Sequence, residues 1–175
     1  MLQVDDLLSV WETYRQARLA LLDQIACSGS NRDPLAEFSE RLVVSLLGGQ
    51  LASSRVQKGY DMIGPAGEYI QVKYLANSGT KWVNQQTVTF DADVDAYALV
   101  FFIDLRPERV FFFVKGCLAT VCQALRKRHP DQDVQLQLTQ SNYNQICAER
   151  ERFKALGLAV FDLAPVTISS GLPRL

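Results

Sequence analysis

The chain has 175 residues, 48% of them hydrophobic and 21% charged, and its formal net charge is −1. These values predict one soluble globular domain with a substantial core, and acids at Asp5 and Asp6 without a long apolar run argue against a secretory signal or a membrane span. Because the net charge is near zero, any nucleic-acid contact must come from a local basic patch.

The cysteine pattern favours a reduced, cytoplasmic protein. Four cysteines lie far apart without the CxxC spacing of a zinc or redox motif, and His129 is the one histidine. This combination is poor for zinc and weak for a disulfide framework, so Cys27, Cys117, Cys122 and Cys147 are interpreted as mostly buried thiols.

Two helices are predicted at the start of the chain. The first covers residues 5–26, with Asp5 as its N-cap and apolar side chains at helical intervals. The second begins at Asp33, with Pro34 in its first turn, and runs to Leu47 before a pair of glycines. The apolar positions of the first helix are Leu8, Trp11, Leu19, Leu22 and Ile25.

One acid of the second helix stands out. Glu37 and Arg41 form an i,i+4 pair that we expect on the solvent-facing side. Glu40 instead falls among apolar positions, where a carboxylate needs a partner or a function. The alternative is that Glu40 is a surface acid on a helix rotated differently from this prediction.

A β-hairpin is predicted over roughly residues 57–75. Its turn is Gly64-Pro65-Ala66-Gly67, in which the last glycine can adopt the left-handed conformation of a three-residue loop. If Gly64 pairs with Glu68, Asp61 lies directly opposite Gln71.

Alternation then divides the hairpin into two faces. Asp61, Gln71 and Lys73 project from one face and resemble a metal site with an attendant cation. The other face is apolar and suits a core; its members are Tyr60, Met62, Ile70, Val72 and Tyr74.

The rest of the chain predicts an α/β protein. A polar loop over 76–90 precedes two interior strands, 96–103 and 109–115, joined by an Arg-Pro-Glu turn. Further predicted elements are a helix over 116–128, a short extended segment at 134–138, a helix from Ser141 to about 156, an edge strand at 158–163 and a loose tail at 167–175. The order predicts a sandwich with a mixed central sheet flanked by helices.

Glu40 on a helix, followed by Asp61 on one strand and Gln71-x-Lys73 on the next, resembles the PD-(D/E)xK nuclease superfamily in its Gln-x-Lys, Mrr-like form. The motif covers residues 40–73, and Tyr60 stands where the motif's proline would precede the acid. The resemblance implies a restriction-endonuclease-like three-layer sandwich over residues 1–166, with a catalytic core at 33–115 and C-terminal helices at 116–163.

The resemblance also implies a Mg²⁺-dependent endodeoxyribonuclease of restriction type, with Mn²⁺ as a substitute metal. Asp61 is then the principal metal ligand, Gln71 and Glu40 complete the shell, and Lys73 orients the attacking water. Tyr60, Ile63 and Tyr69 would limit solvent around the site. A homodimer would suit double-strand cleavage.

Contacts to double-stranded DNA are assigned to the polar loop. It carries amide side chains that can read base edges and a lysine that can bind phosphate: Lys81, Trp82, Asn84, Gln85 and Gln86. The alternative is an ordinary polar loop. Arg126-Lys127-Arg128 could also bind phosphate, although basic residues at a helix C-terminus are favoured by the helix dipole alone.

Two rival functions stay open at this point. The first is a non-catalytic nucleic-acid-binding or assembly module with a degenerate nuclease site. The second is an unrelated α/β protein whose hairpin exposes a polar face without further purpose.

Overall fold

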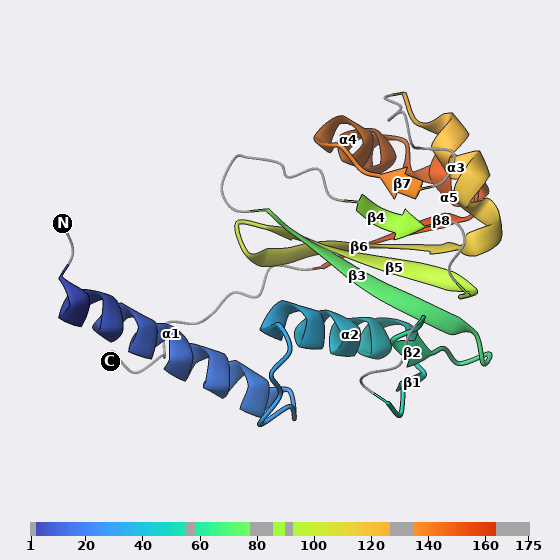
Figure 1. Ribbon diagram of the computed structural model, residues 1–175. Coiled ribbons are helices and arrows are strands. Elements are labelled where there is room, and N and C mark those ends of the chain that lie inside the picture. Colours follow the sequence, from blue (N-terminus) through green and yellow to red (C-terminus); the bar gives the residue numbers. More distant parts are fainter. Residues whose placement is uncertain (1–2, 55–58, 78–85, 90–92, 127–134, 164–175) are drawn as a thin grey trace.

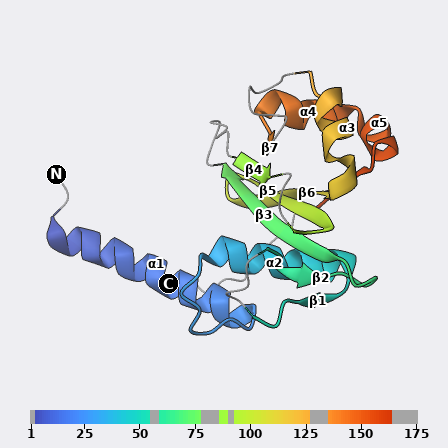
Figure 2. The ribbon, with the colours of Figure 1, turned by 45° about the vertical axis from the view of Figure 1, so that its right-hand side comes forward.

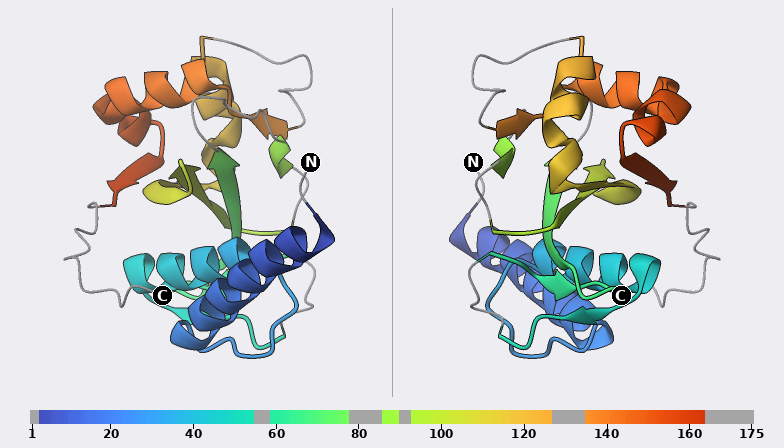
Figure 3. Two further views of the ribbon diagram at one scale, coloured as in Figure 1. Left: turned by 90° about the vertical axis from the view of Figure 1, so that its left-hand side faces the viewer. Right: turned by 90° about the vertical axis from the view of Figure 1, so that its right-hand side faces the viewer.

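A six-stranded sheet lies between two helical layers (Figures 1 and 3). The computed structural model describes residues 3–54, 59–77, 86–89, 93–126 and 135–163. Helix α2 covers one face of the sheet, and α3, α4 and α5 lie over the other. The prediction of an α/β protein with a mixed central sheet is confirmed.

Helix α1 spans Val4–Gln24 and extends away from the rest of the molecule (Figure 2). Its N-cap is Gln3 and not the predicted Asp5, because the Asp6 carboxylate accepts from the Gln3 backbone N–H at 3.1 Å. Most of its apolar side chains are exposed, and Leu22 near its C-terminal end is buried.

Helix α2 spans Pro34–Leu47, as predicted. The Asp33 carboxylate accepts from the Leu35 N–H at 2.8 Å and so satisfies a backbone donor of the first turn. Gly48 follows the last turn with a φ of 82°, a left-handed backbone that favours glycine.

The sheet has the order β1-β2-β3-β5-β6-β8, and β4 pairs separately with β7. Strands β3 and β5 are parallel and the other neighbours are antiparallel, so the sheet is mixed. The strand bounds are β1 Gln50–Leu51, β2 Met62–Ile63, β3 Tyr69–Asn77, β4 Gln86–Thr89, β5 Ala96–Ile103, β6 Arg106–Val114, β7 Gln135–Gln137 and β8 Leu158–Asp162.

The turn between β5 and β6 differs from the prediction. Asp104 and Leu105 both have positive φ, 51° and 58°, which makes a two-residue hairpin loop. The predicted Arg-Pro-Glu turn is therefore wrong, because Arg106 already belongs to β6 and pairs with Ile103. The register shifts between Phe101 and Phe102, so one residue of β6 is extra.

The upper helical layer contains the short 3₁₀ helix η1 (Lys115–Cys117), α3 (Leu118–Ala124), α4 (Gln140–Ala148) and α5 (Arg150–Ala155). Thr139, not the predicted Ser141, caps α4 by accepting from the Asn142 N–H at 3.2 Å. The single helix predicted to reach about residue 156 is two helices, because Glu149 leaves the helical conformation with φ −110° and ψ 38°.

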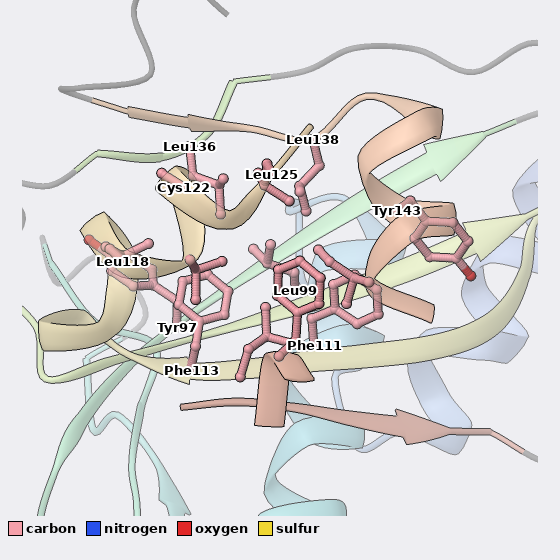
Figure 4. Close-up of a cluster of buried hydrophobic side chains, with 14 of the residues drawn as sticks. Tyr97, Leu99, Phe111, Phe113, Leu118, Cys122, Leu125, Leu136, Leu138 and Tyr143 are labelled. Atoms are coloured by element: carbon pink, nitrogen blue, oxygen red, sulfur yellow. The ribbon is translucent and has the colours of Figure 1, made fainter. Parts of the chain in front are cut away.

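The sheet separates two hydrophobic cores. The core beneath α3, α4 and α5 is rich in aromatic side chains (Figure 4), including Tyr97, Phe101, Phe111 and Tyr143. The core beneath α2 is mainly aliphatic, with Val43, Met62, Ile70, Ala98 and Val110 among its members. Consecutive β5 side chains alternate between the two cores, which explains why that strand is a continuous apolar run.

The connecting segments differ from the prediction at several positions. Ala76 and Asn77 extend β3, and Gln86–Thr89 form β4, so the predicted 76–90 loop is wrong at these positions. The helix predicted over 116–128 ends earlier, at Ala124. The 167–175 tail lies outside the described residues. The four cysteines are thiols, two of them buried and two half-buried. Within the described ranges, no helix is long and apolar enough to cross a membrane.

Candidate functional site

The β2–β3 turn has the predicted geometry. The Gly64 N–H donates to the Glu68 carbonyl at 2.9 Å, and the Gly67 N–H donates to the Gly64 carbonyl at 3.0 Å. Gly67 has a φ of 88°, the left-handed conformation that the loop requires. Met62 pairs with Ile70 in the last regular pair of the ladder, and the Asp61 N–H donates to the Ile70 carbonyl.

The two faces of β3 have different environments. Met62, Ile70 and Val72 are buried in the aliphatic core on the α2 side. Gln71 and Lys73 point to the opposite face, where Gln71 is half-buried and Lys73 is exposed. Among the residues that the structure describes, the Lys73 ammonium has no ion-pair or hydrogen-bond partner. It is therefore available to an anion from solution.

Asp61 lies at the point where β2 separates from β3. One carboxylate oxygen, Oδ2, accepts from the Val72 backbone N–H at 2.8 Å. The Asp61 backbone N–H donates to the Ile70 carbonyl and its carbonyl accepts from the Ala52 N–H, each at 2.9 Å. The Val72 bond holds the half-buried carboxylate through Oδ2, and among the described residues no hydrogen bond engages the second oxygen, Oδ1.

Tyr60 was predicted on the same apolar face of the hairpin as Met62 and Ile70, and this is wrong. The regular strand begins only at Met62, so alternation does not extend back to Tyr60. Its ring instead stacks on Tyr69, with centroids 4.2 Å apart and planes 10° apart, and packs against the aromatic core. The stacked pair therefore lies on the same face as Gln71 and Lys73.

Glu40 is 3% exposed, which rules out the reading of a surface acid. Both of its carboxylate oxygens bind the guanidinium of Arg32, at 2.6 Å and 3.2 Å. This bidentate pair provides the charge partner that a buried carboxylate needs. The Glu40 hydrogen bond is also the main reason that the pKa of Arg32 is raised.

Glu37 was predicted on the solvent-facing side of α2, but it is 2% exposed. The segment between α1 and α2 folds over this part of the helix, and two of its side chains bind the carboxylate: the Cys27 thiol donates at 3.0 Å and the Ser30 hydroxyl at 2.8 Å. The predicted pair with Arg41 does form, at 2.8 Å. Tertiary packing therefore buries an ion pair that helical periodicity places at the surface.

Arg32 connects Glu40 to the hairpin electrostatically. Besides Glu40, the negative charges of Glu37 and Asp61 also raise its pKa. Arg32 is a residue that the sequence analysis missed, because it lies in an irregular segment without periodicity. The position of Arg32 shortly before Glu40, an acid expected among apolar residues, is the signal in the sequence that could have suggested an ion pair.

The structure brings together some of the predicted site residues. The Asp61 carboxylate bonds to the N–H of Val72, between Gln71 and Lys73, whereas Glu40 belongs to α2, which packs on the face of the sheet opposite to Gln71 and Lys73. In the described part of the chain, no three His, Cys, Asp or Glu side chains gather closely enough to hold a metal. A metal here would therefore rest on the Asp61 carboxylate, the Gln71 amide and water.

That donor set fits Mg²⁺. Both groups offer hard oxygen atoms, and Mg²⁺ keeps several waters while taking only one or two carboxylates. The Asp61 carboxylate, which bonds to the Val72 N–H, and the half-buried amide of the neighbouring Gln71 offer such oxygens on this chain.

An open pocket of about 570 Å³ lies where β5 begins and β6 ends. Asp93, Asp95 and Lys115 are among its lining residues. Asp95 fixes the start of β3, since its carboxylate accepts from the Tyr69 N–H at 2.8 Å. The sequence analysis did not select these residues.

The predicted DNA-contacting residues are mostly beyond what the structure describes. Lys81, Trp82, Asn84 and Gln85 lie outside the described ranges, and Gln86 begins β4. Arg126 is engaged by other residues: its backbone N–H donates to Gln145 at 2.9 Å and its guanidinium binds Glu149. Residues 127–129, which complete the predicted basic cluster and include the histidine, are also outside the described ranges.

Comparison with models of known protein families finds no match, and comparison with curated proteins finds no similar sequence.

Proposed function

We propose that this protein is a Mg²⁺-dependent endodeoxyribonuclease with a restriction-endonuclease-like fold. The observation that carries the proposal is the hairpin, in which the Asp61 carboxylate accepts from the N–H of Val72, between Gln71 and Lys73, and the exposed Lys73 ammonium has no partner among the described residues. The mixed sheet, with α2 before the hairpin and β5 parallel to β3, supports the fold assignment.

The roles follow from the chemistry of each side chain. Asp61 and Gln71 would hold the metal, whose chemical contribution is to polarise a phosphate and lower the pKa of a bound water. Lys73 would bind a phosphate oxygen and position the attacking water, and its charge would offset the negative charge that develops during hydrolysis. The Tyr60–Tyr69 stack would limit solvent on this face.

Substitution of the two charged hairpin residues tests the proposal. Asp61→Ala and Lys73→Ala should each abolish Mg²⁺-dependent cleavage of plasmid DNA. Circular dichroism should remain native for Lys73→Ala, whose side chain is exposed. Lys154→Ala, which removes an exposed lysine from α5, is the matched control and should cleave normally. Wild-type activity in the Lys73 variant would refute the assignment.

The second candidate is a nucleic-acid-binding or assembly module with a degenerate site. The observation that favours it is the bidentate Arg32–Glu40 pair, because it occupies both oxygens of an acid that the resemblance assigns to the metal. In such a protein the guanidinium takes the place of the metal as the charge partner of Glu40.

Metal titration of Arg32→Gln separates the two candidates. If the acids retain a metal site, removing the guanidinium frees Glu40 and should strengthen Mn²⁺ binding in calorimetry. Arg41→Gln is the control, since it removes an equal charge from α2 by acting on Glu37 instead. A degenerate site predicts no Mn²⁺ binding in the wild type or in either variant.

A further inference from the structure

Helix α1 exposes a large apolar surface. Seven of its large hydrophobic side chains are 43% to 70% exposed: Val4, Leu7, Leu8, Val10, Trp11, Tyr14 and Leu19. At roughly 100 Å² of exposed area for each large side chain, the total exceeds the largest apolar patch of a typical monomer. A surface of this size indicates that another molecule covers it.

The exposed stripe continues a stripe that is already buried. At the helical repeat, Val4, Trp11 and Leu22 share one side of α1. Leu22 is fully buried where α1 meets α2, and Arg18 donates to the backbone carbonyls of Ser30 and Arg32. The C-terminal turns are thus anchored to the body, while the same side of the N-terminal turns faces solvent.

The N-terminal turns have no tertiary support in the described part of the chain. With the described residues, positions 4–17 make hydrogen bonds, ion pairs and ring contacts only within the helix and its cap. A short helix without packing partners is marginal in water, so a covered apolar face is needed to hold these turns in place.

We propose that two copies of α1 pair antiparallel through this stripe, about a two-fold axis near Trp11, to form a homodimer. Asp5 and Asp6 lie in the first turn, and Arg15 and Arg18 lie further along the helix. Antiparallel pairing places the acidic end of each copy beside the arginines of the other, whereas parallel pairing places like charges together.

The shape of the molecule permits this arrangement. The helix is about 30 Å long at 1.5 Å per residue, and only its C-terminal end joins the globular body (Figures 1 and 2). Antiparallel pairing therefore sets the two bodies at opposite ends of the helix pair. One self-complementary patch then closes the assembly at two copies.

Light scattering with size-exclusion chromatography tests the association. The wild type should have a mass of about 39 kDa, twice the 19.6 kDa of the chain. Trp11→Glu should weaken self-association by on the order of 30-fold or more, as expected for a central aromatic, and any loss of helical circular dichroism should be confined to the contribution of residues 4–17. Thr13→Glu, on the opposite side of α1, should remain dimeric. A wild-type monomer at every concentration, or a dimeric Trp11→Glu protein, would overturn the proposal.

Spin-label distances test the orientation without altering the stripe. Labels on Gln24→Cys should lie about 40 Å apart in an antiparallel dimer centred on Trp11, given the rise per residue. Labels on Thr13→Cys should be much closer to each other, and labelling of the unmodified protein gives the background from its own cysteines. Short distances from both positions would indicate parallel helices and contradict the proposal.

Discussion

Asp61 uses the two oxygens of its carboxylate differently. Oδ2 accepts from the Val72 N–H and continues the bonding between β2 and β3 beyond the last regular pair, while no hydrogen bond to Oδ1 is formed by the described residues. The side chain is thus fixed by the hairpin before any metal binds. Preorganisation of this kind would suit the metal-ligand role proposed for Asp61.

At this scale the sharpest prediction concerns Gln71. If its amide oxygen is a metal ligand, Gln71→Glu adds a negative charge and should keep or raise the affinity for Mn²⁺, whereas Gln71→Leu removes the ligand oxygen and should abolish binding. If Gln71 is only a polar side chain at the surface, both variants should change stability by less than about 0.5 kcal/mol. Identical Mn²⁺ isotherms for the three proteins would eliminate Gln71 as a ligand.

The Asp33 carboxylate forms hydrogen bonds with both α2 and β3, two elements of the candidate site. Asp33 caps α2 through Oδ1 and accepts from the Tyr74 hydroxyl through Oδ2 at 2.7 Å. Burial, and then this hydrogen bond, raise the pKa of Tyr74 to about 12. The bond helps to hold α2, which carries Glu40, against the strand that carries Gln71 and Lys73.

This link predicts an alkaline loss of stability. The folded pKa of Tyr74 lies above the ordinary value of 10.0, so its stabilising contribution is complete below about pH 10 and is lost as the pH rises toward 12. Tyr74→Phe should cost about 1 kcal/mol at neutral pH and reduce the alkaline dependence. Denaturant unfolding across this pH range measures both effects.

Asp33→Asn is the matched control, because asparagine caps a helix as well as aspartate does but carries no charge. It should preserve α2 and lower the pKa of Tyr74 toward its ordinary value. An alkaline transition that is unchanged in Tyr74→Phe would show that another group causes it.

The net charge of the whole molecule limits how strongly it can attract DNA. The net charge of −1 provides no general attraction to phosphate, and Arg126 is already paired with Glu149. The proposed binding must therefore depend on a few local cations. Lys73 is one of them, and the loop between β3 and β4 remains a prediction for the others.

Salt dependence tests that loop. Lys81→Ala combined with Gln85→Ala should weaken DNA binding, and the loss of one phosphate contact should reduce the slope of log affinity against log salt by about 0.9. Lys154→Ala, which removes an equal charge from α5, should leave the slope unchanged. Equal slopes in all three proteins would remove the loop from the interface.

The sequence by itself determined the local parts of this structure. Pro34 after a capping Asp33 determined the start of α2, and the turn from Gly64 to Gly67 determined the hairpin register as far as the pair of Met62 and Ile70. These features depend on backbone conformation over a few residues, so composition and spacing are enough to predict them. The burial of Glu40 was also predictable, from its place among apolar positions of one helix.

Tertiary structure decided what each side chain meets. Arg32, in an irregular segment, binds Glu40, and the same segment buries Glu37 although periodicity places that residue at the surface. The two-residue turn at Asp104 and the break at Glu149 likewise differ from the local signals. The stripe on α1 illustrates the same limit, because helical spacing predicts an apolar face but not whether the protein itself covers it. Contacts between segments distant in the chain are set by packing, which no local pattern encodes.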